Sequence, residues 1–146
     1  MADVAYLALG SNVGDRDAHL AVARAAIAAL PGVTVLRAST IAETAALGPV
    51  PQGPFLNQML AVRTTLEPRA LLKALLGIER AAGRVRTVRW GPRTLDLDIV
   101  RYDDREVHEP SLVVPHPELA RRDFWLCQLV ELGVRERSGA GEPALP

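Results

Sequence analysis

The segment Arg89-Trp90-Gly91-Pro92-Arg93-Thr94-Leu95-Asp96-Leu97-Asp98-Ile99-Val100 changes its pattern at Leu95. From there on, apolar and acidic residues alternate, which is the period of a strand with one buried face. We therefore predict a strand over residues 95–102 whose apolar side chains point into the core. Residues two apart in a strand lie about 6.5–7 Å from each other on the same face, so Asp96 and Asp98 should be neighbours.

This pair of carboxylates has two possible explanations. Neighbouring carboxylates repel each other unless a positive charge lies between them. A divalent cation supplies that charge, and oxygen ligands favour magnesium. An Asp-x-Asp pair on a strand is also common on an ordinary solvated face. The pair alone therefore leaves both interpretations open.

The residues before this strand supply the opposite charge. Glycine and proline interrupt any regular period there, so we expect a loop. It carries four arginines, Arg84, Arg86, Arg89 and Arg93. The forked guanidinium group suits phosphate oxygens. Next to a paired-carboxylate site, such a loop indicates a metal-bound polyphosphate, although the sequence has no G-x-x-x-x-G-K-[ST] motif.

Composition limits the fold and the ligand. The 146 residues, 49% of them hydrophobic, suit one compact domain. Because the formal net charge is zero, we expect a small anionic ligand and no nucleic acid. Cys127 is the only cysteine, which excludes an internal disulfide framework, and we expect its side chain to be buried. We expect neither a signal peptide nor a membrane span, and a cytoplasmic location.

The order of predicted elements defines the fold class. The elements are a strand over 4–9 ending in a turn at 10–12, a helix from Asp15 to Leu30, a strand over 33–43, a loop over 44–54, a strand over 56–65, a helix from Pro68 to Gly83, the strand over 95–102, a hairpin return after 103–104, and a helix from Asp123 to about Leu132. This is the βαββαβ order of a ferredoxin-like sandwich. We predict an α+β fold with an antiparallel sheet, helices on one face and a C-terminal hairpin and helix extension. A single domain over 1–135 should be followed by a disordered tail over 136–146.

Five ordered motifs resemble the 6-hydroxymethyl-7,8-dihydropterin pyrophosphokinase family of folate biosynthesis. They are Leu9-Gly10-Ser11-Asn12, Gly48-Pro49 with Phe55-Leu56-Asn57, Glu79 with Gly83-Arg84-Val85-Arg86, the stretch from Arg89 to Ile99, and Val114-Pro115-His116-Pro117 followed by Arg122 and Phe124. The resemblance extends from Ala5 to about Leu132. Such an ordered set makes a chance agreement implausible.

The resemblance implies a reaction and a set of residues. ATP binds with two magnesium ions, the hydroxymethyl oxygen of the pterin attacks the β-phosphorus, and AMP leaves. By matching positions, Asp96 and Asp98 hold the metals, and Arg84 and Arg93 contact the migrating phosphates. The ATP-binding residues are Glu79, Arg86, Trp90, Ile99, His116 and Arg122. The pterin-binding residues are Thr44, Leu47, Phe55, Asn57 and Phe124. The family implies an ATP-dependent pyrophosphotransferase, and we expect a monomer.

The residue chemistry agrees with these roles but also allows simpler ones. A flat heterocycle needs aromatic faces and a fixed amide, which Phe55, Phe124 and Asn57 provide. Taken singly, the two phenylalanines could be ordinary core residues. Asn57 could be a strand residue whose amide is hydrogen-bonded within the protein, and His116 could be a structural histidine. Glu79 falls in the last turn of its helix, where the helix dipole disfavours a negative charge. That position suits a ligand contact or a surface residue.

Three other functions remain possible at this stage. A non-catalytic ferredoxin-like regulatory module could use the same residues to bind a nucleotide or metabolite. An ordinary kinase would transfer one phosphoryl group and release ADP. A nucleic-acid-binding module is disfavoured by the zero net charge, and its binding would show a salt dependence. The nucleotide product separates the first two from a pyrophosphokinase.

Overall fold

The computed structural model describes residues 2–46, 48–83 and 94–134, and its fold is that predicted from the sequence. Its strands are β1 (Asp3–Ser11), β2 (Val33–Ala38), β3 (Ala42–Thr44), β4 (Phe55–Thr64), β5 (Asp96–Tyr102), β6 (Val107–Glu109) and β7 (Leu112–Val114), and its helices are α1 (Arg16–Ala28), α2 (Pro68–Ala81), a 3-10 turn η1 (Leu119–Arg121) and α3 (Asp123–Glu131). The main sheet has the order β2-β4-β1-β5, with β3 also paired to β4. All these pairs are antiparallel, as expected for a ferredoxin-like sandwich.

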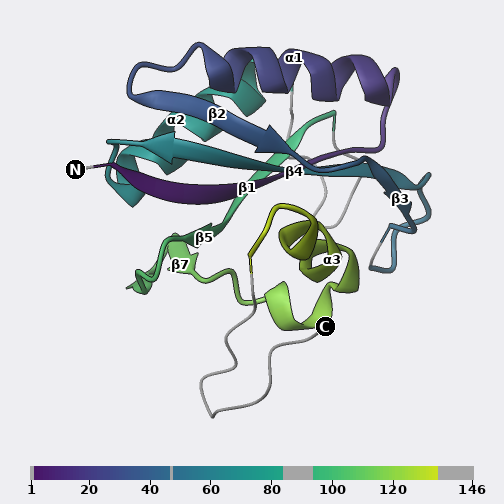
Figure 1. The fold of residues 1–146 in the computed structure, drawn as a ribbon. Helices are drawn as coiled ribbons and strands as arrows, with labels where there is room; N and C mark the ends of the chain where they lie inside the picture. The colour runs from purple at the N-terminus through teal and green to yellow at the C-terminus, as the bar shows by residue number, and fades with distance from the viewer. Residues whose placement is uncertain (1, 47, 84–93, 135–146) are drawn as a thin grey trace.

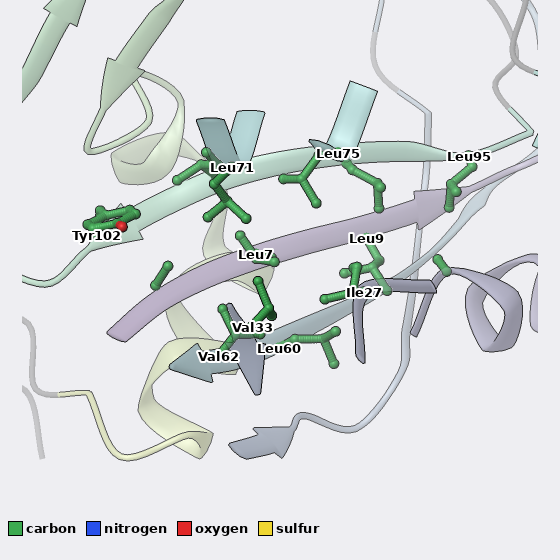
Figure 2. Close-up of a cluster of buried hydrophobic side chains, with 14 of the residues drawn as sticks. Leu7, Leu9, Ile27, Val33, Leu60, Val62, Leu71, Leu75, Leu95 and Tyr102 are labelled. Atoms are coloured by element: carbon green, nitrogen blue, oxygen red, sulfur yellow. The ribbon is translucent and has the colours of Figure 1, made fainter. Parts of the chain in front are cut away.

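The main core lies between the sheet and helices α1 and α2, which cover one face (Figure 1). Alternation along β1 sends Leu7 and Leu9 to this side, where they meet Ile27 of α1 and Leu75 of α2 (Figure 2). Leu97, Ile99 and Tyr102 of β5 join the same cluster. The alternation predicted for β5 is therefore correct.

The other face of the sheet is covered by α3 (Figure 1). Ala8, Met59 and Val100 belong to a second core cluster, together with Trp125 and Leu129 of α3. This cluster fixes the C-terminal helix against the central strands. Helix α3 is the predicted extension, and it lies opposite the two helices of the ferredoxin-like unit.

Local sequence signals set the helix limits. The Asp15 carboxylate caps α1 by accepting a hydrogen bond from the Ala18 N–H at 3.1 Å. Pro68 occupies the first turn of α2, where its missing N–H costs nothing. Gly83 follows α2 with φ +83, a conformation that favours glycine. No helix in the described ranges is both long and apolar enough to cross a membrane.

The strand predicted over residues 33–43 is wrong, because two separate strands, β2 and β3, occupy this stretch. Between them the chain leaves the regular ladder. The Ser39 hydroxyl accepts a hydrogen bond from the Met59 N–H at 2.9 Å, while the Ser39 N–H donates to the Met59 carbonyl at 2.8 Å. A side chain thus takes the place of a backbone carbonyl. The predicted turn at 10–12 also differs, because Gly10 and Ser11 continue β1.

Two further expectations need correction. The return after Asp103 is a hairpin of β6 with β7, and within the described residues only an isolated bridge joins Tyr102 to Asp104. Cys127 is exposed, not buried. On α3 it lies about 200° around the axis from Trp125, whose side of the helix packs on the sheet. The apolar run around Cys127 gave no indication of which side would be buried.

Candidate active site

Asp96 and Asp98 lie on β5, the edge strand of the main sheet. Both are partly exposed, while Leu97 between them is buried. They therefore share one face, as the period-two pattern predicted. The Asp98 Oδ1 atom lies 3.7 Å from the Nε2 atom of His116. The carboxylate pair is thus bordered by His116, which the resemblance assigns to the ATP-binding residues.

His116 is held in a defined orientation. Its backbone N–H donates a hydrogen bond to the Val100 carbonyl at 2.9 Å, and its ring Nδ1 accepts one from the Glu118 backbone N–H at 3.0 Å. In the neutral ring the proton therefore resides on Nε2, the nitrogen nearest to Asp98. The ring also meets Trp125 edge-on, with centroids 4.8 Å apart. His116 can donate a hydrogen bond toward Asp98 or a ligand oxygen beside it.

Trp125 brings together two residues that the resemblance places on the ATP side. It contacts His116, and the guanidinium carbon of Arg122 lies 4.4 Å from the centroid of the Trp125 ring. This distance allows a cation–π interaction. The Arg122 Nε is buried and has no hydrogen-bond partner in the part of the chain that the structure describes. Sequence reasoning missed Trp125, although its spacing of three from Arg122 at a helix start was a usable signal.

Glu79 is buried, with 3% of its surface exposed, so it is not a surface residue. Its Oε2 accepts a hydrogen bond from the Leu97 N–H at 2.7 Å. This bond joins the last turn of α2 to the edge strand between the two aspartates. The carboxylate thereby gives Leu97, on an edge strand, a hydrogen-bond partner for its N–H.

A cleft of about 690 Å³ lies beside this strand. It is lined by Arg69, Leu72, Lys73, Leu76, Glu79, Arg80, Asp96, Leu97, Asp98 and Ser111. Leucines of α2 and β5 provide an apolar wall, whereas the aspartate pair, Glu79 and three cationic side chains provide charge. A site with one apolar wall and a few charged groups suits a ligand that carries a heterocyclic base at one end and negative charge at the other. Ile99 is different, because its side chain is in the core and only its backbone could reach a ligand.

Three of the residues predicted for the pterin, Thr44, Phe55 and Asn57, lie on the paired strands β3 and β4. Thr44 is opposite Phe55 in the register. The Asn57 Nδ2 donates to the Thr44 Oγ1 at 2.7 Å and to the Ala42 carbonyl at 3.4 Å. These bonds hold the amide and make its orientation definite. Thr44, Phe55 and Asn57 therefore form one wall.

Helix α3 is tethered to this wall. The Gln128 Nε2 donates to the Asn57 carbonyl at 3.1 Å. Phe124, one turn earlier on the same helix, lies 6.1 Å from Trp125 between ring centroids. Phe124 is thus carried by a helix that is hydrogen-bonded to the wall of Thr44, Phe55 and Asn57 and that contacts His116 through Trp125.

Gly10 connects the two sides of the site and was not a predicted site residue. In the sheet register it is opposite Asn57 on β4 and Asp96 on β5. Residues opposite each other share a face, and neighbouring strands are about 4.8 Å apart. Asn57 and Asp96 therefore lie about 10 Å apart across a strand that has no side chain between them. The wall with the fixed amide and the carboxylate pair face a common space.

Five predicted residues cannot be placed in this way. Leu47, Arg84, Arg86, Trp90 and Arg93 lie outside the described residues. Apart from Ile99, whose side chain lies in the core, the other predicted site residues lie on the aspartate side, on the Asn57 wall or on α3, which contacts both.

A comparison with models of protein families gives a match over nearly the whole chain. Residues 6–134 match the model described as 7,8-dihydro-6-hydroxymethylpterin-pyrophosphokinase (HPPK). The chain belongs to this family. The match spans nearly all of the described chain, both sides of the site included.

Individual relatives support the same assignment. The chain is 43% identical over 132 residues to the 2-amino-4-hydroxy-6-hydroxymethyldihydropteridine pyrophosphokinase of Bacillus subtilis (strain 168), covering 90% of this chain and 79% of the relative. It is 44% identical over 128 residues to the enzyme of the same name from Methylorubrum extorquens, covering 88% and 81% of the two chains.

A solved structure supports the fold. A crystal structure of Plasmodium falciparum HPPK-DHPS resembles this chain with a TM-score of 0.69 at 13% identity. The similarity covers 90% of this chain and 40% of that longer one. At this identity the likeness shows the fold alone, and that fold agrees with the family match.

Proposed function

We propose that the family reaction takes place between the two sides of the site described above. The chain is a dihydropteridine pyrophosphokinase, which transfers pyrophosphate from ATP to 6-hydroxymethyl-7,8-dihydropterin in folate biosynthesis. We assign ATP to the cleft beside Asp96 and Asp98, and the pterin to the wall of Thr44, Phe55 and Asn57. The observation that carries this assignment is the register of β1, which sets Asn57 and Asp96 on one face with Gly10 between them.

The aspartate pair fits magnesium. The described ranges contain no group of three or more His, Cys, Asp or Glu side chains that could hold a metal ion by themselves, so a metal here would rest on two carboxylates and on ligands from the substrate. Magnesium is commonly bound by one or two carboxylates, with substrate phosphates and water completing the coordination. Asp96 and Asp98 would hold two ions that arrive with ATP. Bound there, magnesium neutralises the negative charge of the β- and γ-phosphates.

The remaining residues position the reactants. Phosphoryl transfer depends mainly on positioning and on charge stabilisation, so no strong general base is required. The Nε2–H of His116 is directed at Asp98 and can donate to a phosphate oxygen beside it. Glu79, through Leu97, fixes the strand that carries both aspartates. Arg122, Arg86, Trp90 and the backbone of Ile99 complete the ATP side.

Two arginines that precede β5 in the sequence act on the transferred group. Arg84 and Arg93 are assigned to the migrating phosphates, where charge develops as AMP leaves. Such contacts strengthen in the transition state and therefore support kcat more than substrate binding. Arginine suits this role better than lysine because of its planar fork.

The unit that carries out this reaction is the single domain over residues 1–135. We propose that it acts as a monomer, because both sides of the site come from one chain, and that it acts in the cytoplasm, where folate biosynthesis enzymes find ATP. Sedimentation at the protein concentration of the activity assay would test the monomer. A dimer under those conditions would contradict it.

The decisive experiment is identification of the nucleotide product. ATP and 6-hydroxymethyl-7,8-dihydropterin are incubated with the protein, and the nucleotides are separated by ion-exchange chromatography. We expect AMP in equal amount to the pterin diphosphate. Release of ADP would show transfer of a single phosphoryl group, and binding without turnover would indicate a regulatory module. The variant Asp98→Asn serves as the inactive control.

A further inference from the structure

The pterin wall includes the open end of a hairpin. Strands β3 and β4 are joined by residues 45–54, and Thr44 and Phe55 face each other where this connection begins and ends. Both residues are assigned to the pterin. The distance between the two strand ends therefore helps to set the shape of the binding wall. A contact that fixes this distance should affect binding of the substrate.

Arg16, the first residue of α1, holds both strand ends. Its Nη1 donates to the Glu43 Oε2 at 2.8 Å and to the Pro54 carbonyl at 2.9 Å. Glu43 directly precedes Thr44, and Pro54 directly precedes Phe55. One guanidinium group thus connects the two chain segments that enter the pterin wall.

The surroundings of Arg16 make it a firm anchor. Helix α1 buries Leu20, Ala23 and Ile27 in the main core. From the segment just before the helix, the Asn12 Nδ2 donates to the Gln52 Oε1 at 2.7 Å and to the Gly53 carbonyl at 3.0 Å. Residues 52, 53 and 54 therefore all accept hydrogen bonds from Asn12, just before α1, or from Arg16, its first residue.

We propose that Arg16 is a positioning residue for the pterin, which it affects by fixing the ends of β3 and β4. This proposal rests on the assignment of the pterin to that wall. The Arg16 and Glu43 side chains are 29% and 55% exposed, and exposed ion pairs contribute little to stability. The contact with Pro54 is a charge-assisted hydrogen bond to the backbone, which restrains the chain directly. Its loss should therefore be visible in substrate binding more than in folding.

The test is steady-state kinetics of Arg16→Ala. We expect the KM for the pterin to rise about three- to tenfold, as for the loss of one charge-assisted hydrogen bond, with the KM for ATP within twofold of wild type. Glu43→Gln keeps an acceptor at this position and leaves the Pro54 contact intact, so its pterin KM should stay within twofold. Arg16→Lys should restore part of the binding, because it keeps the charge but not the fork.

Arg24→Ala is the matched control. Arg24 lies on the same helix and its Nη1 donates to the Gln58 Oε1 on the same strand β4 at 2.7 Å, away from the hairpin ends. We expect no change in its pterin KM. The proposal is overturned if Arg16→Ala behaves like Arg24→Ala, or if it raises the KM for ATP and for the pterin equally. Phe55→Ala is measured in parallel: a normal pterin KM in that variant would refute the pterin assignment itself, whereas a raised one with a silent Arg16→Ala refutes the role of Arg16 alone.

Discussion

Replacing Gly10 by alanine should separate folding from substrate binding. A Cβ at this position would lie 3.4 Å from the Phe55 Cδ2, 3.5 Å from the Asn57 Oδ1 and 3.9 Å from the Leu56 carbonyl. These are ordinary contact distances, and Gly10 is not among the glycines with positive φ. The alanine side chain therefore fits the folded protein without strain.

The expected effect on stability is small and favourable. Alanine reduces the conformational freedom of the unfolded chain and should stabilise the protein by about 0.4–1 kcal/mol. For a domain of this size that corresponds to an increase of about 1–4 °C in Tm. A fall in Tm by several degrees would show that the close approach at Gly10 is tighter than these distances indicate.

The expected effect on the pterin is large and unfavourable. The new methyl group would contact the Asn57 Oδ1, the atom that can accept a hydrogen bond from the edge of the pterin. Loss of one buried hydrogen bond costs about 1–3 kcal/mol, or about 5- to 150-fold in kcat/KM for the pterin. Steady-state kinetics, with Tm measured by differential scanning calorimetry, tests both effects on one sample.

Two results would refute this reasoning. A kcat/KM for the pterin within twofold of wild type would mean that the pterin does not use the space over Gly10. If the binding of an ATP analogue in the absence of the pterin were weakened as much as that of the pterin, the methyl group would be disturbing the whole site. Combining Gly10→Ala with Phe55→Ala adds a check, because residues in contact should show non-additive effects.

Three further predictions concern single residues. Asp96→Asn and Asp98→Asn should each lower kcat by a factor of about 10²–10³. The Tm should stay the same or rise slightly, because each change relieves the repulsion between two half-buried carboxylates. Unfolding of both variants would show a structural role. Phe55→Ala should weaken pterin binding by about 1–3 kcal/mol in calorimetric titration, by analogy with base stacking, and equal weakening of ATP would identify it as a core residue. Glu79→Ala should lower the free energy of unfolding by about 1–3 kcal/mol in urea denaturation, because the Leu97 N–H loses its partner, and an unchanged midpoint would rule out this contribution.

The sequence predicted the elements whose signals are local. The alternation in β5, the start of α1 near Asp15 and the start of α2 at Pro68 each depend on residues within a few positions, and all three predictions are correct. The break between β2 and β3 is of another kind. It is stabilised by Gln128, whose Nε2 donates to the Thr40 carbonyl at 3.4 Å from a helix 88 residues later in the chain. No local pattern could reveal that contact.

Site residues follow the same distinction. The aspartate pair could be predicted from its period, and most other positions came from the resemblance to a family. The roles of Trp125, Gly10 and Arg16 depend on what the fold places beside them. A glycine in a strand indicates a close approach of some kind, but the register alone shows that Gly10 is opposite both Asn57 and Asp96. The buried state of Glu79 likewise follows from α2 packing beside β5.

The register of the central strand links the fold to the reaction we propose. Asn57, Gly10 and Asp96 form one row across β4, β1 and β5, although they are far apart in the sequence. Shifting β4 or β5 by one residue would turn the Asn57 or Asp96 side chain to the opposite face, toward α1 and α2. The buried leucines of β1 and β5 oppose such a shift, since it would expose them. The hydrophobic core therefore fixes the spacing of about 10 Å between the wall that we assign to the pterin and the carboxylates that we assign to magnesium.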